Sequence, residues 1–502
     1  MDIHDKRSYD LGRNKIELIA YGAVIGLTAG LVSVLYRYVL HKMDVIRDLA
    51  FASMTPLRFA LWILGALAVS LILHFLLKKA PYTGGGGIPQ MRAELEHKID
   101  QNVPWSLISK FFGGGLATLG GLTLGREGPS IQLGGLAAKG VAKLTKRPAV
   151  QQRSLITAGC SAGLAAAFNA PLAGVLFALE EMQKSMSHYF MATALVASLV
   201  ANFVSYSLMG MDPAFAMPME EMLPMNLIWI PIGVGVVSGI VARIYNWGMI
   251  LLVERRLKTK IPKYWLIFSA MVLAALVGLY DPSLMGDGHG FVENLAQAPT
   301  ALHILFIAFI LRMILVWTGN GSGVQGGIFM PILALGAIVG VAAFQILGMD
   351  QVFIHNFIYL GMAGVLAGSI GAPLLSIILV SEMSGSMEQF ISVAVVSMVG
   401  YGVAMILKNV PIYESLYELQ FADPVALPGT YDMSYFLISG DAPLVGMRLT
   451  DVPLPPDAVV TSICRDRMCF TPSPETLLKG GDELLITLPA DQLVEVSELF
   501  HP

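Results

Sequence analysis

Charged side chains are scarce in this sequence. Asp, Glu, Lys and Arg together make up 14% of its 502 residues, whereas soluble domains carry about 25%. Hydrophobic residues make up 55%, and the mean hydropathy is +0.66. This composition excludes an ordinary soluble protein and predicts a polytopic membrane protein surrounded by membrane lipid. The net charge of -4 gives no indication of a nucleic-acid partner.

Cysteine is also rare, with three residues in the chain. Cys160 lies inside an apolar run, and the spacing of Cys464 and Cys469 does not match a zinc pattern. We therefore expect neither a disulfide nor a metal site, and the nine histidines form no ligand cluster in the sequence. No cofactor is expected.

Long apolar segments alternate with short polar ones over most of the chain. Residues 1–15 form a basic tail that is too polar for a cleavable signal peptide. The apolar segments that follow span residues 16–40, 59–77, 105–124, 131–141, 155–179, 189–208, 227–252, 265–280, 301–317, 328–347, 353–380 and 390–407. Several are shorter than the ~20 residues that a membrane span needs, or are cut by Gly and Pro. Interrupted segments at matching positions of two halves indicate the binding site of a transporter.

The two halves of this region match at a constant shift of 202 residues, the separation of Gly125 from Gly327. The same shift aligns Pro129 with Pro331, the tripeptide 170–172 with 372–374, and Glu180 with Glu382. An internal repeat is therefore predicted, and broken helices that meet at the membrane midplane favour an inverted one.

The segment Gly125-Arg126-Glu127-Gly128-Pro129 places two charges between apolar runs. A charge at mid-membrane costs roughly 2.5–3.5 kcal/mol on insertion scales and usually marks an ion pathway. Proline is tolerated in the first turn of a helix, and the glycines allow a tight approach of the backbone. We expect a broken helix whose N-terminus begins inside the membrane and attracts an anion at the position of Glu127. The alternative is a surface loop with a solvated Arg–Glu pair.

The composition changes near residue 420. Residues 433–439, 459–465 and 483–488 read as strands, and residues 491–500 as a closing helix, which together predict a small soluble domain. A disordered tail would contain fewer Val, Ile, Leu and Phe residues. Basic clusters in residues 1–15, 139–153 and 255–263 place these segments on the cytoplasmic side.

Four motifs framed by Gly or Pro lie in one order along the chain, at residues 85–89, 125–129, 327–331 and 411–413. In this order and spacing, residues 15–420 resemble the CLC family of chloride channels and chloride/proton antiporters. The resemblance implies an all-helical, inverted-repeat membrane domain over residues 16–420, with repeats at about 16–210 and 226–420. It also implies a homodimer with one pore in each subunit.

The resemblance also implies roles for individual residues. Glu127 matches the gating glutamate, and Glu181 matches the internal glutamate that accepts protons in antiporters. The remaining matches comprise the anion-binding positions Gly86, Gly87, Ile328, Phe329 and Tyr413, and the pore motif Gly125, Arg126, Gly128 and Pro129. The family usually has serine at the position of Gly86, so the missing hydroxyl leaves the preferred anion open.

Residues 430–502 resemble the C-terminal regulatory domain of potassium-conductance regulators, which implies a cytoplasmic domain that binds a small regulatory ligand. Together the resemblances predict a multi-pass protein of the inner or plasma membrane, with cytoplasmic termini, that exchanges chloride or a similar small anion for protons. The alternatives are an uncoupled CLC-type channel and a cation-coupled transporter of an organic substrate. A membrane enzyme would need a nucleophile–base or metal constellation, which the sequence lacks.

Overall fold

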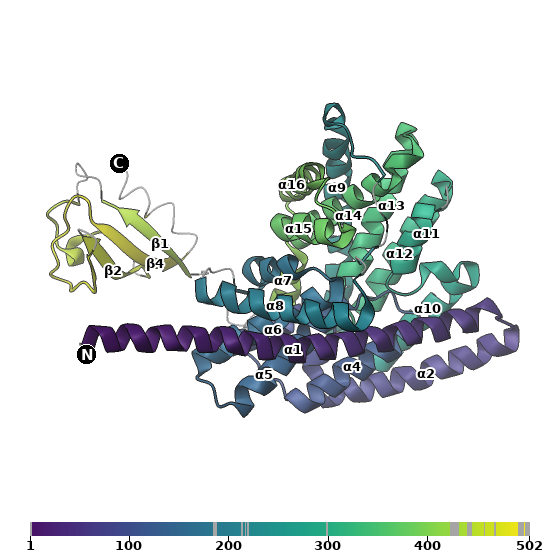
Figure 1. Cartoon of the computed structure of the whole chain (residues 1–502), viewed down its shortest axis with the longest axis horizontal. Helices are drawn as coiled ribbons and strands as arrows, with labels where there is room; N and C mark the ends of the chain where they lie inside the picture. The colour runs from purple at the N-terminus through teal and green to yellow at the C-terminus, as the bar shows by residue number, and fades with distance from the viewer. Residues whose placement is uncertain are drawn as a thin grey trace. The chain divides into compact units, whose positions relative to one another are not determined.

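A computed structural model describes residues 3–183, 188–211, 214–215, 217, 220–297, 300–421, 431–438, 444–455, 457–465, 468–489 and 496. The chain divides into two units, Met1–Phe421 and Ala422–Pro502. The first unit is helical, and the second contains a small sheet (Figure 1).

The helices of the first unit follow the apolar segments of the sequence. They are α1 (Ile3–Ala52), α2 (Pro56–Lys79), α3 (Ile88–Leu95), α4 (Val103–Leu119), α5 (Glu127–Leu144), α6 (Ala149–Phe168), α7 (Pro171–Phe177), α8 (His188–Met209), α9 (Trp229–Lys258), α10 (Lys263–Tyr280), α11 (His289–Gln297), α12 (Leu302–Gly321), α13 (Phe329–Leu347), α14 (Ile354–Ile370), α15 (Pro373–Ser384), α16 (Phe390–Ile406) and α17 (Ile412–Phe421). Within the described residues, eight helices are long and apolar enough to cross a membrane. The backbone of residues 3–15, which the sequence analysis gave as a basic tail, is helical and forms the first part of α1.

Two long apolar segments are each broken into two helices at the same place in the repeat. The first breaks at Asn169, which has a φ of 56°, and the second at Gly371, which has a φ of 82°. Pro171 and Pro373 then begin α7 and α15. The left-handed residue ends one helix and the proline starts the next, because proline fits the first helical position.

Reciprocal contacts relate the two repeats by a local two-fold axis. Gly125 and Gly327 each donate the backbone N–H to the other's carbonyl, at 2.8 and 2.7 Å. The carboxylate of Glu180 accepts from the backbone N–H of Leu375 at 2.7 Å, in the first turn of α15. These contacts confirm the predicted repeat.

The counterpart of Glu180 completes the exchange. Glu382 accepts from the backbone N–H groups of Leu172 and Ala173, at 3.0 and 2.8 Å, in the first turn of α7. Each repeat thus caps a helix of the other, as a two-fold relation requires.

Glycine contacts bring the central helices together in both repeats. A side-chain carbon at Gly134 of α5 would lie 2.3 Å from the carbonyl oxygen of Gly159 in α6. The equivalent carbon at Gly336 of α13 would lie 2.5 Å from the carbonyl oxygen of Gly361 in α14. No larger residue fits either crossing without a backbone shift, so glycine sets the distance between these helices.

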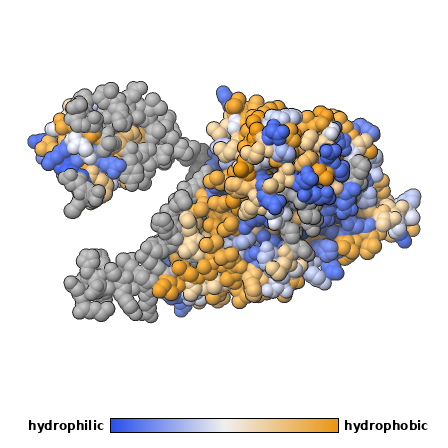
Figure 2. Space-filling model, turned by 45° about the horizontal axis from the view of Figure 1, so that its top comes forward, coloured by the Kyte–Doolittle hydropathy of each residue, from blue (hydrophilic) through white to orange (hydrophobic). Residues whose placement is uncertain are grey.

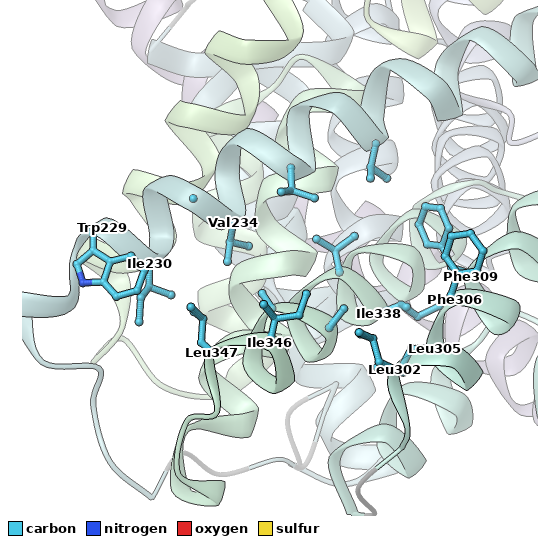
Figure 3. Close-up of a pocket in the computed structure, with 16 residues that line it drawn as sticks. Trp229, Ile230, Val234, Leu302, Leu305, Phe306, Phe309, Ile338, Ile346 and Leu347 are labelled. Atoms are coloured by element: carbon cyan, nitrogen blue, oxygen red, sulfur yellow. The ribbon is translucent and has the colours of Figure 1, made fainter.

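The outer surface of the membrane unit is apolar over broad areas (Figure 2). A cavity of about 550 Å³ opens there between α9, α12 and α13 (Figure 3). Its labelled side chains carry a single polar atom, the indole nitrogen of Trp229. An ion would find no ligands in it, so this cavity is not the anion site.

The second unit contains a four-stranded antiparallel sheet in the order β1-β4-β2-β3. The strands are β1 (Tyr431–Leu437), β2 (Val459–Arg465), β3 (Met468–Phe470) and β4 (Glu483–Pro489). Three of them match the predicted strands, whereas the short β3 was not predicted. The expected closing helix at 491–500 lies outside the described residues, apart from Val496.

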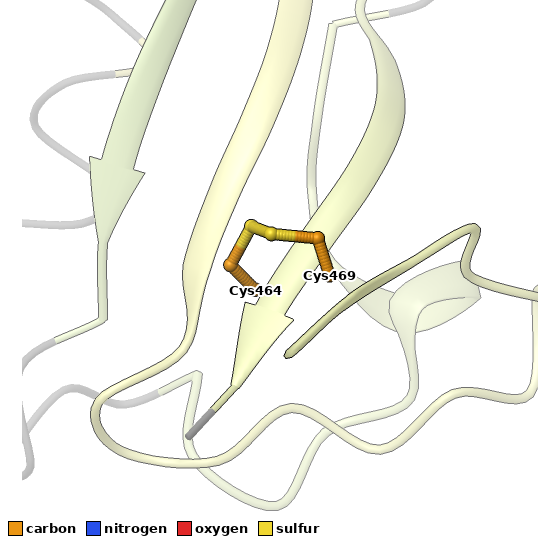
Figure 4. Close-up of a disulfide and its surroundings, with 2 residues drawn as sticks. All are labelled: Cys464 and Cys469. Carbon is orange, nitrogen blue, oxygen red and sulfur yellow. A yellow bond between two sulfur atoms is a disulfide. The ribbon is translucent and has the colours of Figure 1, made fainter. Parts of the chain in front are cut away.

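A disulfide joins Cys464 of β2 to Cys469 of β3 (Figure 4). The expectation that these cysteines stay unpaired is therefore wrong. They are directly opposite in the register of the β2–β3 hairpin, with Cα atoms 3.9 Å apart. The spacing alone did not reveal the hairpin, since the turn residues between the strands carry no strong hairpin signal.

Candidate anion site

A break between α4 and α5 brings the Gly125–Pro129 motif to the centre of the membrane unit. The chain leaves α4 at Leu119 and begins α5 at Glu127, with Arg126 in the N-cap position. Pro129 lies in the first turn of α5, as predicted from the sequence. No described side chain caps this helix, so its first N–H groups have no partner in the helix or from a cap.

Backbone hydrogen bonds join three of the glycine motifs. Besides the Gly125–Gly327 pair, Gly85 donates its N–H to the carbonyl of Val324 at 2.8 Å, and Gly326 donates to the carbonyl of Gly85 at 3.1 Å. Gly128 is close as well, because a side-chain carbon there would lie 2.7 Å from the carbonyl oxygen of Gly86. Motifs far apart in the sequence thus form one compact backbone cradle.

The N-terminus of α13 faces this cradle. Ile328 is its N-cap residue and Phe329 its first helical residue, and both are buried. The N-cap residue Ile328 has no polar side chain to cap the helix, and the carboxylate of Glu127 is directed at the N–H of Met330 in its first turn. A helix terminus with free N–H groups and a positive dipole end is suited to binding an anion.

Tyr413 approaches the same place from α17. Its ring centroid lies 5.7 Å from that of Phe329, and its hydroxyl accepts or donates no hydrogen bond among the described residues although it is buried. Asn246 of α9 fixes the segment before α17 by donating from Nδ2 to the carbonyl of Val410 at 3.0 Å. The free hydroxyl is available to a bound anion, since a buried hydroxyl without a partner is costly.

Glu127 is fully buried beside the first turn of α13. A side-chain carbon at Gly125 would lie 2.5 Å from Oε2 of Glu127 and 3.2 Å from the backbone nitrogen of Met330. The carboxylate is directed at the backbone N–H groups of Glu127 itself and of Met330, at the starts of α5 and α13. The nearest charge is Arg126, whose Nε lies 3.7 Å from Oε1 of Glu127. The carboxylate therefore occupies a position that an anion could take.

A polar cavity of about 420 Å³ lies next to Arg126 and is lined by Arg47, Asp287, His289 and Glu293 among others. Although burial raises it, the nearby Arg126 guanidinium and His289 hold the pKa of Asp287 below its ordinary value. Asp287 is thus ionised at neutral pH. The cavity places positive and negative side chains next to Arg126, the residue that precedes Glu127.

Gly86 lies in the cradle with room for a side chain. An added carbon there would lie no nearer than 3.6 Å to another atom, the α-carbon of Gly327. Gly87 has no such room, because its φ is 94° and an added carbon would lie 2.5 Å from Oε1 of Gln132. The missing hydroxyl at residue 86 is therefore not a consequence of crowding.

The two glutamates at the end of α7 differ in their surroundings. They lie in a short π-helical segment, Ala178–Gln183. Glu180 caps α15 by accepting from the backbone N–H groups of Leu374 and Leu375. Glu181 is half-buried, and its role in proton transfer stays a prediction.

Sequence reasoning did not single out Lys110. This residue lies in α4 and is fully buried, with Nζ donating to the carbonyls of Gly85 at 2.6 Å and Thr83 at 3.1 Å. Its amino group lies under the Gly85 loop and fixes this loop through the two hydrogen bonds. A lysine inside the apolar run 105–124 was the available signal, by the same argument that applies to Arg126.

Comparison with known proteins places these features in a family. The profile described as voltage-gated chloride channel matches residues 64–405, and that of the TrkA-C domain matches residues 433–501. The H(+)/Cl(-) exchange transporter ClcA of Salmonella arizonae is 29% identical over 428 residues, which cover 82% of this chain and 90% of that protein. ClcA of Salmonella typhimurium gives the same identity over 429 residues, with the same coverage.

Solved structures agree. A slow cyanobacterial Cl-/H+ antiporter superposes with a TM-score of 0.76 at 28% identity, over 81% of this chain and 98% of that one. The fold of a CLC-type fluoride/proton antiporter is also similar, with a TM-score of 0.66 over 80% of this chain and 97% of that one, at 23% identity. The chain therefore belongs to the voltage-gated chloride channel (CLC) family, with a TrkA-C domain at its C-terminal end.

Proposed function

We propose that this protein exchanges chloride, or a similar small monovalent anion, for protons across the membrane. The observation that carries this proposal is the carboxylate of Glu127, which is buried at the backbone N–H groups that begin α5 and α13. A group that can be protonated there competes with an anion for the same place. The names of the similar ClcA proteins support the same activity.

Exchange follows from alternate occupancy of one position. Protonation of Glu127 removes its charge, frees the carboxyl group to leave, and opens the outer position to an anion. Deprotonation returns a carboxylate that expels the anion, because two negative charges cannot share one cradle. Proton and anion thus move in opposite directions through the same site.

The central anion would be held by the backbone N–H groups of Ile328 and Phe329 and by the hydroxyl of Tyr413. Gly86 and Gly87 would line the site with backbone alone. Lys110 would hold the Gly85 loop in place from beneath the cradle through its hydrogen bonds to Thr83 and Gly85. Glu181 would pass protons between the cytoplasm and Glu127 along a path separate from that of the anion.

The assembly and location follow the resemblance. We propose a homodimer in the inner or plasma membrane, with one pore in each subunit and both termini in the cytoplasm. The C-terminal domain, residues 430–502, would bind a small regulatory ligand. An uncoupled channel is the second candidate, and the presence of Glu181 beside the structural Glu180 is the feature that favours exchange over it.

The test is proton movement driven by an anion gradient. Liposomes that contain the purified protein would be loaded with chloride and diluted into a low-chloride buffer of the same pH. Chloride efflux should then drive proton uptake into the liposomes, which an external pH electrode would record. Valinomycin and potassium would clamp the voltage. A channel would release chloride without proton uptake, and a transporter of organic substrates would release none. Repeating the assay with bromide, nitrate and fluoride would identify the preferred anion.

A further inference from the structure

A second pocket, of about 390 Å³, lies between the end of α9, the start of α10 and the end of α12. We call it the Arg256 pocket. Its rim carries Arg255 and Arg256 with the hydroxyls of Thr259 and Ser322, and its wall carries Leu266 and Leu273 of α10. The anion site uses none of these residues.

Arg256 is the unusual member of the rim. Its guanidinium lies on the turn after α12, where a side-chain carbon at Gly323 would be 1.9 Å from Nη1. It is half-buried, and it forms no ion pair or side-chain hydrogen bond with a described residue. A guanidinium placed in this way is incomplete without an anion.

The charges around Arg256 are mostly positive and favour the binding of a negative ligand. Lys263, the first residue of α10, is in electrostatic range of Arg256 and repels it. The acidic residue nearest in sequence, Glu254, is paired with Lys258. Lys260 is exposed in the loop between the helices and does not line the pocket. Positive charge therefore gathers at the rim without internal compensation.

The wall of the pocket is apolar and lies along the membrane. The candidate spans Met225–Lys258 and Lys263–Tyr280 end and begin at the rim. Lipid headgroups lie at this level, and basic pockets between helices on the cytoplasmic side bind anionic headgroups. The apolar wall, which continues along α10 at Ala270, would suit an acyl chain rather than a soluble anion.

We propose that the Arg256 pocket binds an anionic phospholipid, with the headgroup phosphate on Arg256 and Arg255 and one acyl chain along α10. The phosphate supplies the acceptor oxygens that the guanidinium of Arg256 lacks.

Binding there would act on the anion cradle. Arg256 lies on Gly323, and a side-chain carbon at Gly84 would be 2.7 Å from the carbonyl oxygen of Gly323. The next residue, Val324, accepts the N–H of Gly85. Lipid on Arg256 would hold the loop that leads to Ile328, so occupancy should raise the transport rate. This consequence rests on the proposed function, whereas binding does not.

Lipid binding can be measured on the full-length protein in detergent. Native mass spectrometry and the thermal shift would be followed while phosphatidylglycerol or phosphatidylcholine is added. Arg256→Gln should weaken phosphatidylglycerol binding at least ~10-fold, because a charge-assisted contact is lost. Lys260→Gln removes one charge from the same loop and should weaken it no more than ~5-fold, since a basic residue near the surface contributes about 1 kcal/mol. Ser269→Trp fills the pocket without changing a charge and should prevent phosphatidylglycerol from binding.

Three results would overturn the proposal. These are equal binding of phosphatidylcholine, equal loss in Lys260→Gln and Arg256→Gln, and equal protection by inorganic phosphate, which would indicate a soluble anion. Chloride efflux in liposomes with and without phosphatidylglycerol then tests the consequence. If lipid binds Arg256 but the anion flux lacks proton coupling, the proposed function fails while the lipid site stands.

Discussion

The carboxylate of Glu127 lies in the protein interior and is directed at the backbone N–H groups of Glu127 and Met330. Arg126 is its nearest charged neighbour, at 3.7 Å. An ionised carboxylate in the interior is costly unless such groups stabilise it, and protonation removes that need. In the proposed mechanism, protonation therefore releases the side chain from this position.

Glu127→Gln should keep the shape of the side chain and remove its titration. We expect anion flux to continue, because the amide cannot return as a competing charge, and proton movement to fall to the level of protein-free liposomes. Flux and proton uptake would be recorded in the same proteoliposomes. Glu254→Gln, which removes an exposed carboxylate paired with Lys258, is the control and should leave both unchanged. Persistent coupling in Glu127→Gln would remove this residue from the mechanism.

Gly86→Ser should change which anion is preferred without unfolding the protein. The position has room for a side-chain carbon, and the hydroxyl would add a donor to the central anion. One such hydrogen bond is worth about 1 kcal/mol, so the nitrate-to-chloride permeability ratio should change about 5-fold. Gly87→Ser, which meets a positive φ and Gln132, should instead lower the yield of folded protein. An unaltered ratio in a folded Gly86→Ser protein would place the anion away from this loop.

The sequence predicted the charged motif at the centre of the site but missed a buried lysine that supports it. The Gly125–Pro129 motif is recognisable in the sequence because two charges and two glycines interrupt apolar runs. Lys110 is a single lysine, and only the fold reveals that its ammonium group reaches the Gly85 carbonyl. Contacts of this kind depend on how helices distant in sequence pack, which the order of residues does not specify.

At the scale of helices, the exchange of caps between α7 and α15 stabilises the junction of the repeats. Each carboxylate accepts two backbone N–H groups from the first turn of the other helix. Such caps combine hydrogen bonds with a favourable charge at the helix dipole.

Glu382→Ala should remove one of these caps and lower the free energy of unfolding by about 1–2 kcal/mol. The reason is that the N–H groups of Leu172 and Ala173 lose their acceptor. The melting temperature in detergent measures the effect, with exposed Glu388→Ala as control. Proton coupling should persist in the folded fraction, so a specific loss of coupling with unchanged Tm would show that Glu382 acts in transport instead.

In the sheet of the C-terminal unit, Asp482 accepts from Arg465 through both oxygens, at 2.6 and 2.7 Å. Although burial raises it, these hydrogen bonds and the N–H of Lys479 keep the pKa of Asp482 below its ordinary value. The pair therefore stabilises the domain above the ordinary pKa of about 4, and this contribution is lost as pH falls through the lower, folded-state pKa.

Asp482→Asn should destabilise the domain by about 1–3 kcal/mol at neutral pH and reduce its sensitivity to acid. Hydrogen exchange of the β2 and β4 amides in the full-length protein would measure both effects. Asp451→Asn alters an exposed residue and should change neither. Equal acid sensitivity of Asp482→Asn and the unaltered protein would contradict the assignment.

The helix break at Gly125–Pro129 was predicted, because glycine and proline interrupt apolar runs there. The α6–α7 and α14–α15 breaks were not predicted, since residues 155–179 and 353–380 each form one apolar segment in the sequence. The amphipathic α11 and the three-residue β3 are too short to give a clear periodic pattern, and their positions depend on the neighbours they pair with. The same dependence explains why the Cys464–Cys469 disulfide was missed.

At the scale of the whole molecule, the two-fold relation of the repeats places the starts of α5 and α13 against each other. Gly125 and Gly327 are equivalent residues of the two repeats, and each donates a hydrogen bond to the other. Two helix N-termini from separate halves thus face one small volume, and each contributes positive potential to it. An acidic side chain from one half can then displace an anion held by the other, which couples the two fluxes.

The reversal potential under a pH gradient tests this coupling most directly. Planar bilayers containing the protein would have equal chloride on both sides and a pH difference of about 2 units. An exchanger gives a reversal potential displaced from zero toward that set by protons, and Glu127→Gln returns it to zero, because only the anion then carries current. A reversal potential of zero in the unaltered protein, with chloride current present, would contradict proton exchange and leave a channel.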